Sequence, residues 1–141
     1  TRGHISVWFA ESDALFCGDT LFALGCGRVF EGTMEEMWKS LLKLRSLSPT
    51  AKIYCGHEYT LSNAKFALSI DSENNKLRNR VKDFEKMRSE GIPTIPSVLI
   101  DELETNPFLR ADDPVLATTL GMAGADPVSV FAEIRRQKDN F

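Results

Sequence analysis

The chain has 141 residues, a length typical of one domain or of two small units that share a border. Hydrophobic residues make up 43% of it and charged residues 26%, which disfavours disordered, collagen-like and coiled-coil proteins. The net charge of −3 gives no signature of binding to nucleic acid or to an anionic membrane, and two histidines are too few for a metal site built from several histidines.

The first predicted elements are strands. Residues 5–10 alternate in polarity and predict a strand whose buried face carries Ile5, Val7 and Phe9, and residues 11–13 indicate a turn. Residues 14–17 and 52–55 are short, mostly apolar segments, each of which ends in a cysteine and is followed by a glycine. They predict two strands that are buried on both faces.

A helix is predicted between these two strands. Thr33 is suited to be its N-cap, and Glu36 completes a capping box three residues later. Strand, helix and strand form a βαβ crossover, so we expect the two strands to be parallel. One face of the helix is apolar and is predicted to pack inward: Met34, Met37, Trp38, Leu41 and Leu42.

After about residue 60 the pattern becomes helical. Helices are predicted over 63–70, over a stretch from Leu77 that Gly91 stops, and over 98–104, with residues 94–96 extended. A last helix is predicted to begin with Asp126 as its N-cap, and its apolar residues Val128, Phe131 and Ile134 are predicted to face the core. We therefore expect an α/β unit at 1–60 and a helical unit at 61–141.

The three cysteines are Cys17, Cys26 and Cys55. They lack CxxC spacing and are too few for a disulfide scaffold, which favours a reducing compartment. The sequence has no signal peptide pattern and no run of about 18 apolar residues. Because it opens directly on a predicted strand, we expect it to be part of something longer.

The two predicted parallel strands end in the same way, with Cys-Gly-Asp at 17–19 and Cys-Gly-His at 55–57. Ligands of open α/β sheets gather at the carboxyl ends of strands, so Asp19 and His57 are predicted to converge. A carboxylate can bridge two cations and an imidazole can hold one, as in a zinc or iron hydrolase that activates water. The alternative is that Asp19 caps a turn and His57 is a loop histidine.

For six further residues the sequence leaves more than one role open. His4 is a ligand, a hydrogen-bonding support for one, or an ordinary strand residue. Arg28 follows a glycine-rich loop and either holds a carboxylate or phosphate or lies exposed in a turn. Arg135 and Lys138 share a helix face and form either an anion clamp or a last turn stabilised by the helix dipole. Cys17 and Cys55 are soft ligands or, more in keeping with strands, small buried side chains.

Together these residues resemble the C-terminal half of glyoxalase II, the hydroxyacylglutathione hydrolase family of the metallo-β-lactamase fold superfamily. The most specific segments are Cys-Gly-His-Glu-Tyr-Thr at 55–60 and Arg-Arg-x-Lys-Asp at 135–139. The resemblance covers essentially the whole chain through residues 1–5, 16–22, 25–28, 30–33, 54–60, 106–110 and 135–141.

The resemblance implies the second half of a metallo-β-lactamase-like αββα sandwich, followed by a C-terminal α-helical domain that binds glutathione. It implies that Asp19 bridges two divalent ions, zinc or alternatively iron or manganese, that His57 binds one of them, and that a metal-bound hydroxide attacks the substrate. His4 then supports a ligand. The residues implied in substrate binding are Arg28, Phe30, Tyr59, Arg135 and Lys138, with Phe30 where the family often has a tyrosine.

The implied reaction is hydrolysis of S-(2-hydroxyacyl)glutathione, typically S-lactoylglutathione to glutathione and lactate in methylglyoxal detoxification. The resemblance also implies a protein that is a monomer when full-length, lies in the cytoplasm or alternatively the mitochondrion, and has no nucleic acid or membrane partners. The family's Thr-His-x-His-x-Asp-His motif is missing from the sequence. We therefore expect an incomplete, inactive chain with partial or no metal binding and uncovered apolar sheet faces. Two alternatives are a non-catalytic glutathione-binding module and a related iron-dependent enzyme acting on glutathione persulfide.

Overall fold

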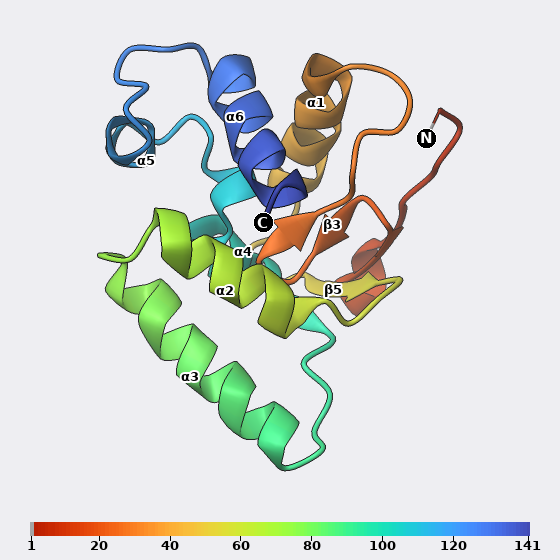
Figure 1. Cartoon of the computed structure of the whole chain (residues 1–141). Coiled ribbons are helices and arrows are strands. Elements are labelled where there is room, and N and C mark those ends of the chain that lie inside the picture. The colour runs from red at the N-terminus through yellow and green to blue at the C-terminus, as the bar shows by residue number, and fades with distance from the viewer. Residues whose placement is uncertain (1) are drawn as a thin grey trace.

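The computed structural model describes residues 2–141. Thr1, the first residue of the segment 1–5 that resembles glyoxalase II, lies outside the described residues. Strands and helices alternate in the first part of the chain, and helices dominate the second (Figure 1). The strands are β1 (Val7–Phe9), β2 (Ala14–Gly18), β3 (Leu21–Phe22), β4 (Gly25–Cys26), β5 (Lys52–Cys55) and β6 (Ser97–Val98). The helices are α1 (Met34–Arg45), α2 (Thr60–Ile70), α3 (Asn75–Ser89), α4 (Leu99–Thr105), α5 (Pro114–Thr119) and α6 (Pro127–Asp139), with 3-10 turns at Ala10–Ser12 and Pro107–Leu109.

The main sheet has the strand order β1-β2-β5-β6. β2 and β5 pair in parallel with α1 between them in sequence, which confirms the predicted βαβ unit. β1 and β6 are antiparallel edge strands, and β3 and β4 form a separate two-stranded hairpin. α1 packs beside α6 on one side of the molecule, and α2 and α3 lie side by side on another (Figure 1).

Local capping signals are confirmed. The Thr33 hydroxyl accepts the Glu36 N–H at 3.1 Å, and the Glu36 carboxylate accepts the Thr33 N–H at 2.8 Å, which is the capping box of α1. Asp126 accepts the Ser129 N–H at 3.1 Å and caps α6. The inward residues of the two helices include Trp38, Leu41, Phe131 and Ile134 as predicted, and all four are buried.

The predicted burial of the strands is wrong on one face of the sheet. Phe9 and Phe16 are 52% and 47% exposed, and Ile5 and Val7 are also exposed, whereas Trp8 is the β1 side chain packed against the core. Alternation separates two faces without indicating which one packs inward. In β5, Tyr54 is only half-buried, so that β2 and β5 are buried mainly on the side of Leu15, Cys17 and Ile53.

The open face carries an aromatic row across three strands. The Phe9 and Phe16 rings meet edge to face with centroids 5.8 Å apart, and Phe16 stacks on Tyr54 at 4.8 Å. We call Val7, Phe9, Phe16 and Tyr54 the open sheet face. The expected uncovered apolar surface is thus present in the part of the chain that the structure describes.

The structure differs from the prediction in four further places. α2 begins at Thr60, three residues before the predicted start, and the hairpin β3–β4, the edge strand β6 and helix α5 were not predicted. The turn of the hairpin, Ala23 and Leu24, packs into a second apolar cluster with α2 and α3. The helical part therefore holds the hairpin in place. The division of the chain at residue 60 stays a prediction.

Within residues 2–141, no helix combines the length and apolar character that a membrane crossing needs.

Candidate functional site

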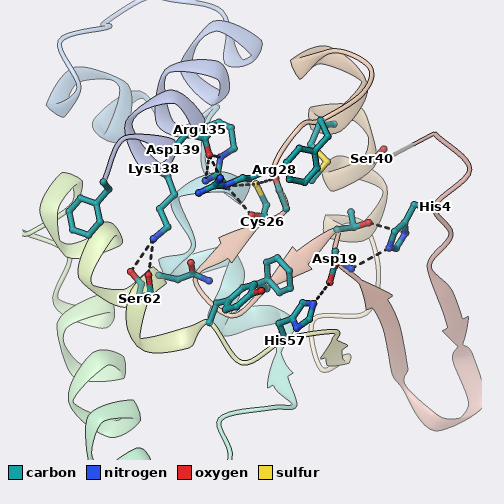
Figure 2. A pocket seen from close by; sticks show the side chains of 18 residues that line it. His4, Asp19, Cys26, Arg28, Ser40, His57, Ser62, Arg135, Lys138 and Asp139 are labelled. Atoms are coloured by element: carbon teal, nitrogen blue, oxygen red, sulfur yellow. Dashed lines mark hydrogen bonds and ion pairs between the residues drawn. The ribbon is translucent and has the colours of Figure 1, made fainter.

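One cavity of about 770 Å³ gathers the eight residues that the resemblance implies for the site. Its walls come from the ends of β2 and β5, the hairpin, the start of α2 and the end of α6. Figure 2 shows His4, Asp19 and His57 on one side of it, and Arg28, Arg135 and Lys138 on the other. The eight predicted residues on its lining are His4, Asp19, Arg28, Phe30, His57, Tyr59, Arg135 and Lys138.

Asp19 and His57 meet at the carboxyl ends of the parallel strands, as predicted. His57 Nε2 lies 3.6 Å from Asp19 Oδ1. The glycine before each residue makes this approach possible, because a Cβ at Gly56 would lie 2.6 Å from Asp19 Oδ1. Gly18 has φ of +49° and a Cβ there would lie 2.6 Å from His4 Nε2. Gly18 and Gly56 thus allow the side chains of His4 and Asp19 to pack against the backbone.

His4 supports the backbone of Asp19. Its Nε2 accepts the Asp19 N–H at 3.2 Å. With Nε2 as acceptor, the proton of the neutral ring is on Nδ1, which faces the Thr20 hydroxyl at 3.5 Å. Both ring nitrogens therefore have partners, a placement that favours the supporting role over direct ligation.

Arg135 is the best-held cation of the cavity. It is buried, donates from Nη1 to the Cys26 carbonyl at 2.9 Å and makes a two-point contact with Asp139, at 3.0 Å from Nε and 2.8 Å from Nη2. Its guanidinium also lies over the Phe108 ring, 5.0 Å from the centroid. Nη1 also lies 3.8 Å from Cys26 Sγ, so that of the five N–H groups of Arg135 at least one, on Nη2, has no protein partner among residues 2–141.

Arg28 and Lys138 complete a cationic wall. Arg28 Nε lies 3.5 Å from the same Asp139 carboxylate, and Lys138 Nζ donates to the Ser62 carbonyl at 3.2 Å and hydroxyl at 3.1 Å. Burial first, and then the positive charges of Arg135 and Arg28, lower the pKa of Lys138 below its ordinary value of 10.5. Two of the three cations contact the Asp139 carboxylate and the third contacts the neutral Ser62, so this wall carries a surplus of positive charge that suits an anionic ligand.

Aromatic side chains also line the cavity. Tyr59 stacks on His57 with centroids 5.0 Å apart and meets Phe22 edge to face at 5.3 Å. Phe30 lines the cavity from a position that is 79% exposed. Tyr59 can thus hold the imidazole ring in place and offer a hydroxyl to a ligand.

The loop that carries His57 and Tyr59 is anchored by Glu58. The Glu58 carboxylate accepts the N–H and the hydroxyl of Thr94, at 2.7 and 2.8 Å. These hydrogen bonds lower the pKa of Glu58, with a further contribution from Arg88. The segment before β6 therefore fixes the backbone from which two site residues project.

The cysteines are suited to packing. Burial raises the pKa of Cys17 and of Cys26 to about 12, and it also raises the pKa of Cys55. The Cys17 thiol donates to the Leu21 carbonyl at 3.1 Å, and that of Cys55 to the His57 carbonyl at 3.2 Å. Protonated, hydrogen-bonded thiols are poor metal ligands, which favours the interpretation of small buried side chains.

Sequence reasoning missed five polar residues of the cavity: Thr20, Ser40, Ser62, Asn63 and Asp139. Asp139 had a detectable signal, since it stands four residues after Arg135 and can reach it on the same helix face. Ser62 and Asn63 had none, because their placement depends on the start of α2, which the sequence put three residues too late.

The chemistry of Asp19 and His57 fits a divalent metal, for which carboxylate oxygen and imidazole nitrogen are common donors. Among residues 2–141, no group of three or more His, Cys, Asp or Glu side chains is arranged to hold a metal ion. Residues 2–141 therefore contribute two metal donors, Asp19 and His57.

The class of protein follows from this arrangement. Residues 1–57 match the sequence model of the metallo-beta-lactamase superfamily, in agreement with parallel strands that present Asp19 and His57 at their carboxyl ends. Residues 58–141, more than half of the chain, match the model described as hydroxyacylglutathione hydrolase C-terminus. The chain belongs to the hydroxyacylglutathione hydrolase family, and both the resemblance and the fold class predicted from the sequence are confirmed.

Curated relatives agree with this assignment. Proteins named hydroxyacylglutathione hydrolase from Methylococcus capsulatus and Rhodospirillum rubrum are each 55% identical over 141 residues, which is 100% of this chain and 55% of the relative. One from Rhodopseudomonas palustris is 55% identical over 140 residues, 99% of this chain and 55% of the relative. The chain thus spans about half the length of the curated relatives it matches.

Proposed function

We propose that this chain binds the glutathione part of an S-(2-hydroxyacyl)glutathione and supplies two donors to the metal centre that hydrolyses its thioester bond. The observation that carries this proposal is the single cavity with Asp19 and His57 on one side and three cations on the other. A glutathione thioester has the matching polarity, because its carboxylates lie away from the acyl group. The names of the relatives support the same substrate class.

The cationic wall holds the peptide. Arg135, fixed by Asp139 and the Cys26 carbonyl, donates from Nη2 to a ligand carboxylate, and Lys138 and Arg28 add charge. Because these contacts do not change as the thioester reacts, they contribute to binding and orientation more than to the chemical step. Tyr59, which lines the same cavity beside His57, offers its hydroxyl to the ligand.

Asp19 and His57 would hold the metal, which we propose to be zinc, with iron and manganese as alternatives. When bound, such ions polarise the thioester carbonyl and lower the pKa of a coordinated water. In the overall reaction, water oxygen bonds to the acyl carbon, the carbon–sulfur bond breaks, and a proton passes to the sulfur. His4 keeps Asp19 oriented through its backbone N–H.

Two donors are fewer than the three protein ligands usual for catalytic zinc. We therefore expect the isolated 141-residue chain to bind glutathione thioethers without hydrolysing thioesters. The three cysteines are free, which suits a reducing compartment such as the cytoplasm.

Calorimetric titration of the chain with S-methylglutathione, a stable thioether, tests the binding proposal. Arg135→Met removes the fixed guanidinium, and Arg136→Met is the matched control, because Arg136 is exposed and pairs with Glu133 instead. We expect measurable binding that Arg135→Met weakens at least tenfold and Arg136→Met leaves unchanged. Absence of binding by the parent chain, or equal effects of the two variants, would contradict the proposal.

A further inference from the structure

Asn63 is a cavity residue with a fixed side chain. It lies on α2, is 6% exposed, and donates from Nδ2 to the Ala23 carbonyl at 3.1 Å. Its amide packs directly on the hairpin, because a Cβ at Gly25 would lie 2.4 Å from Nδ2 and 3.0 Å from Oδ1. A glycine at residue 25 therefore makes room for this amide and restricts its movement.

The contact with Ala23 also sets the direction of the amide. A carbonyl oxygen only accepts hydrogen bonds, so the amide nitrogen must face Ala23 and Oδ1 must face away from it. Residues 2–141 give Oδ1 no hydrogen-bond donor, and the polar side-chain atom that is both fully shielded and unpaired among them is Ser97 Oγ. Asn63 Oδ1 therefore remains accessible, and the cavity that Asn63 lines is the space it faces.

Two acceptors near the cationic wall are already engaged. The Asp139 carboxylate is engaged by Arg135 and Arg28, and the Ser62 hydroxyl accepts from Lys138. The cations serve the carboxylates of a ligand, but a peptide ligand also brings N–H groups that lose their water on binding. A buried acceptor already fixed in place satisfies one of them with little loss of conformational entropy.

We infer that Asn63 Oδ1 accepts a hydrogen bond from one of the two amide N–H groups of the glutathione moiety, and so selects for a peptide over other thioesters. The inference rests on the proposed function, since it assumes that the cavity binds a glutathione thioester. Asn63 acts in it as a specificity residue that contacts the ligand backbone.

Two ester analogues of S-methylglutathione test this contact, each with one amide N–H replaced by an ester oxygen. The shape of the ligand is kept while a single donor is lost. We expect one analogue to bind the parent chain about tenfold more weakly than S-methylglutathione, the factor that corresponds to about 1.4 kcal/mol. In Asn63→Leu, which lacks the acceptor, that difference between ester and amide ligands should disappear. Asn75→Leu, on the neighbouring helix α3 and outside the cavity, is the matched control and should keep it.

The outcomes separate this inference from the proposed function. If the parent chain binds S-methylglutathione and both ester analogues equally well, the Asn63 contact is refuted while the proposed function stands. If the parent chain binds none of the three, the proposed function fails and the inference with it. An ester penalty that persists in Asn63→Leu also refutes the contact. Equal binding of the three ligands by the parent chain refutes the contact even if Asn63→Leu does not fold, and Asn63→Asp, which keeps an acceptor oxygen, should retain the ester penalty.

Discussion

The most sensitive structural position away from the cavity is Glu102 on α4. Its carboxylate is fully buried, accepts the Leu24 N–H at 2.9 Å and an Asn106 N–H at 3.0 Å, and forms an ion pair with Arg80. Leu24 has φ of +56°, a left-handed conformation that costs free energy for a residue with a side chain. Glu102 therefore joins α3 and α4 to the turn of the hairpin whose second strand leads to Arg28.

Glu102→Ala leaves the largely buried Arg80 guanidinium without its counter-charge and the Leu24 N–H without an acceptor. Breaking a buried pair by removing one partner costs about 3–5 kcal/mol. That is a large share of the roughly 5–15 kcal/mol by which small proteins are stable. The Thr105 hydroxyl, which accepts from Arg80 at 2.7 Å, offsets part of the loss, so we expect a decrease of about 3 kcal/mol in the free energy of unfolding.

Urea denaturation followed by circular dichroism measures this change, provided that the transition is two-state. Glu104→Ala is the matched control, because Glu104 lies on the same helix but forms its ion pair with Lys76 in a solvent-exposed setting. Exposed pairs contribute about 0–1 kcal/mol. A Glu102→Ala variant no less stable than Glu104→Ala would refute the argument that this carboxylate holds the hairpin.

Three further outcomes are expected. In an active enzyme that contains this chain, Arg135→Ala should raise KM and change kcat little, and steady-state kinetics with unchanged KM but collapsed kcat would contradict its role in binding. A ligand carboxylate beside Lys138 favours the ammonium form and raises its pKa, so affinity for S-methylglutathione should fall as the pH rises toward 10.5. Calorimetry should find this fall reduced in Lys138→Met, and an equal fall in both proteins would contradict it. Because the open sheet face is apolar and exposed, we expect the isolated chain to self-associate, and Phe16→Ser should reduce this association in sedimentation velocity, with a loss of about 1 kcal/mol of stability from its ring contacts. Unchanged association would contradict it.

The parts of the fold predicted correctly depend on local rules. A capping box at Thr33 and an N-cap at Asp126 act over three or four residues, so the starts of α1 and α6 could be read from the sequence. The βαβ rule then placed β2 beside β5 and brought Asp19 to His57. Local signals and one topological rule were enough for that side of the cavity.

The parts that were missed depend on tertiary contacts. β3, β4 and β6 have two residues each and exist only because neighbouring segments pair with them, which no short sequence pattern reveals. The buried face of β1 was misassigned because both Trp8 and Phe9 are apolar, and only packing decides between them. Asn63 escaped notice for the same reason, since an asparagine on a helix becomes a binding residue only when a hairpin fixes its amide.

The central claim is that residues 1–141 carry the glutathione-binding wall and two metal donors of a hydroxyacylglutathione hydrolase. The most direct test replaces the matching 141 residues of the Methylococcus capsulatus relative with this chain and measures release of glutathione from S-lactoylglutathione. The account predicts that the chimaera hydrolyses the thioester and that Asp19→Asn abolishes the activity while the protein still binds S-methylglutathione. A folded chimaera without hydrolysis, or hydrolysis that Asp19→Asn leaves intact, would contradict it.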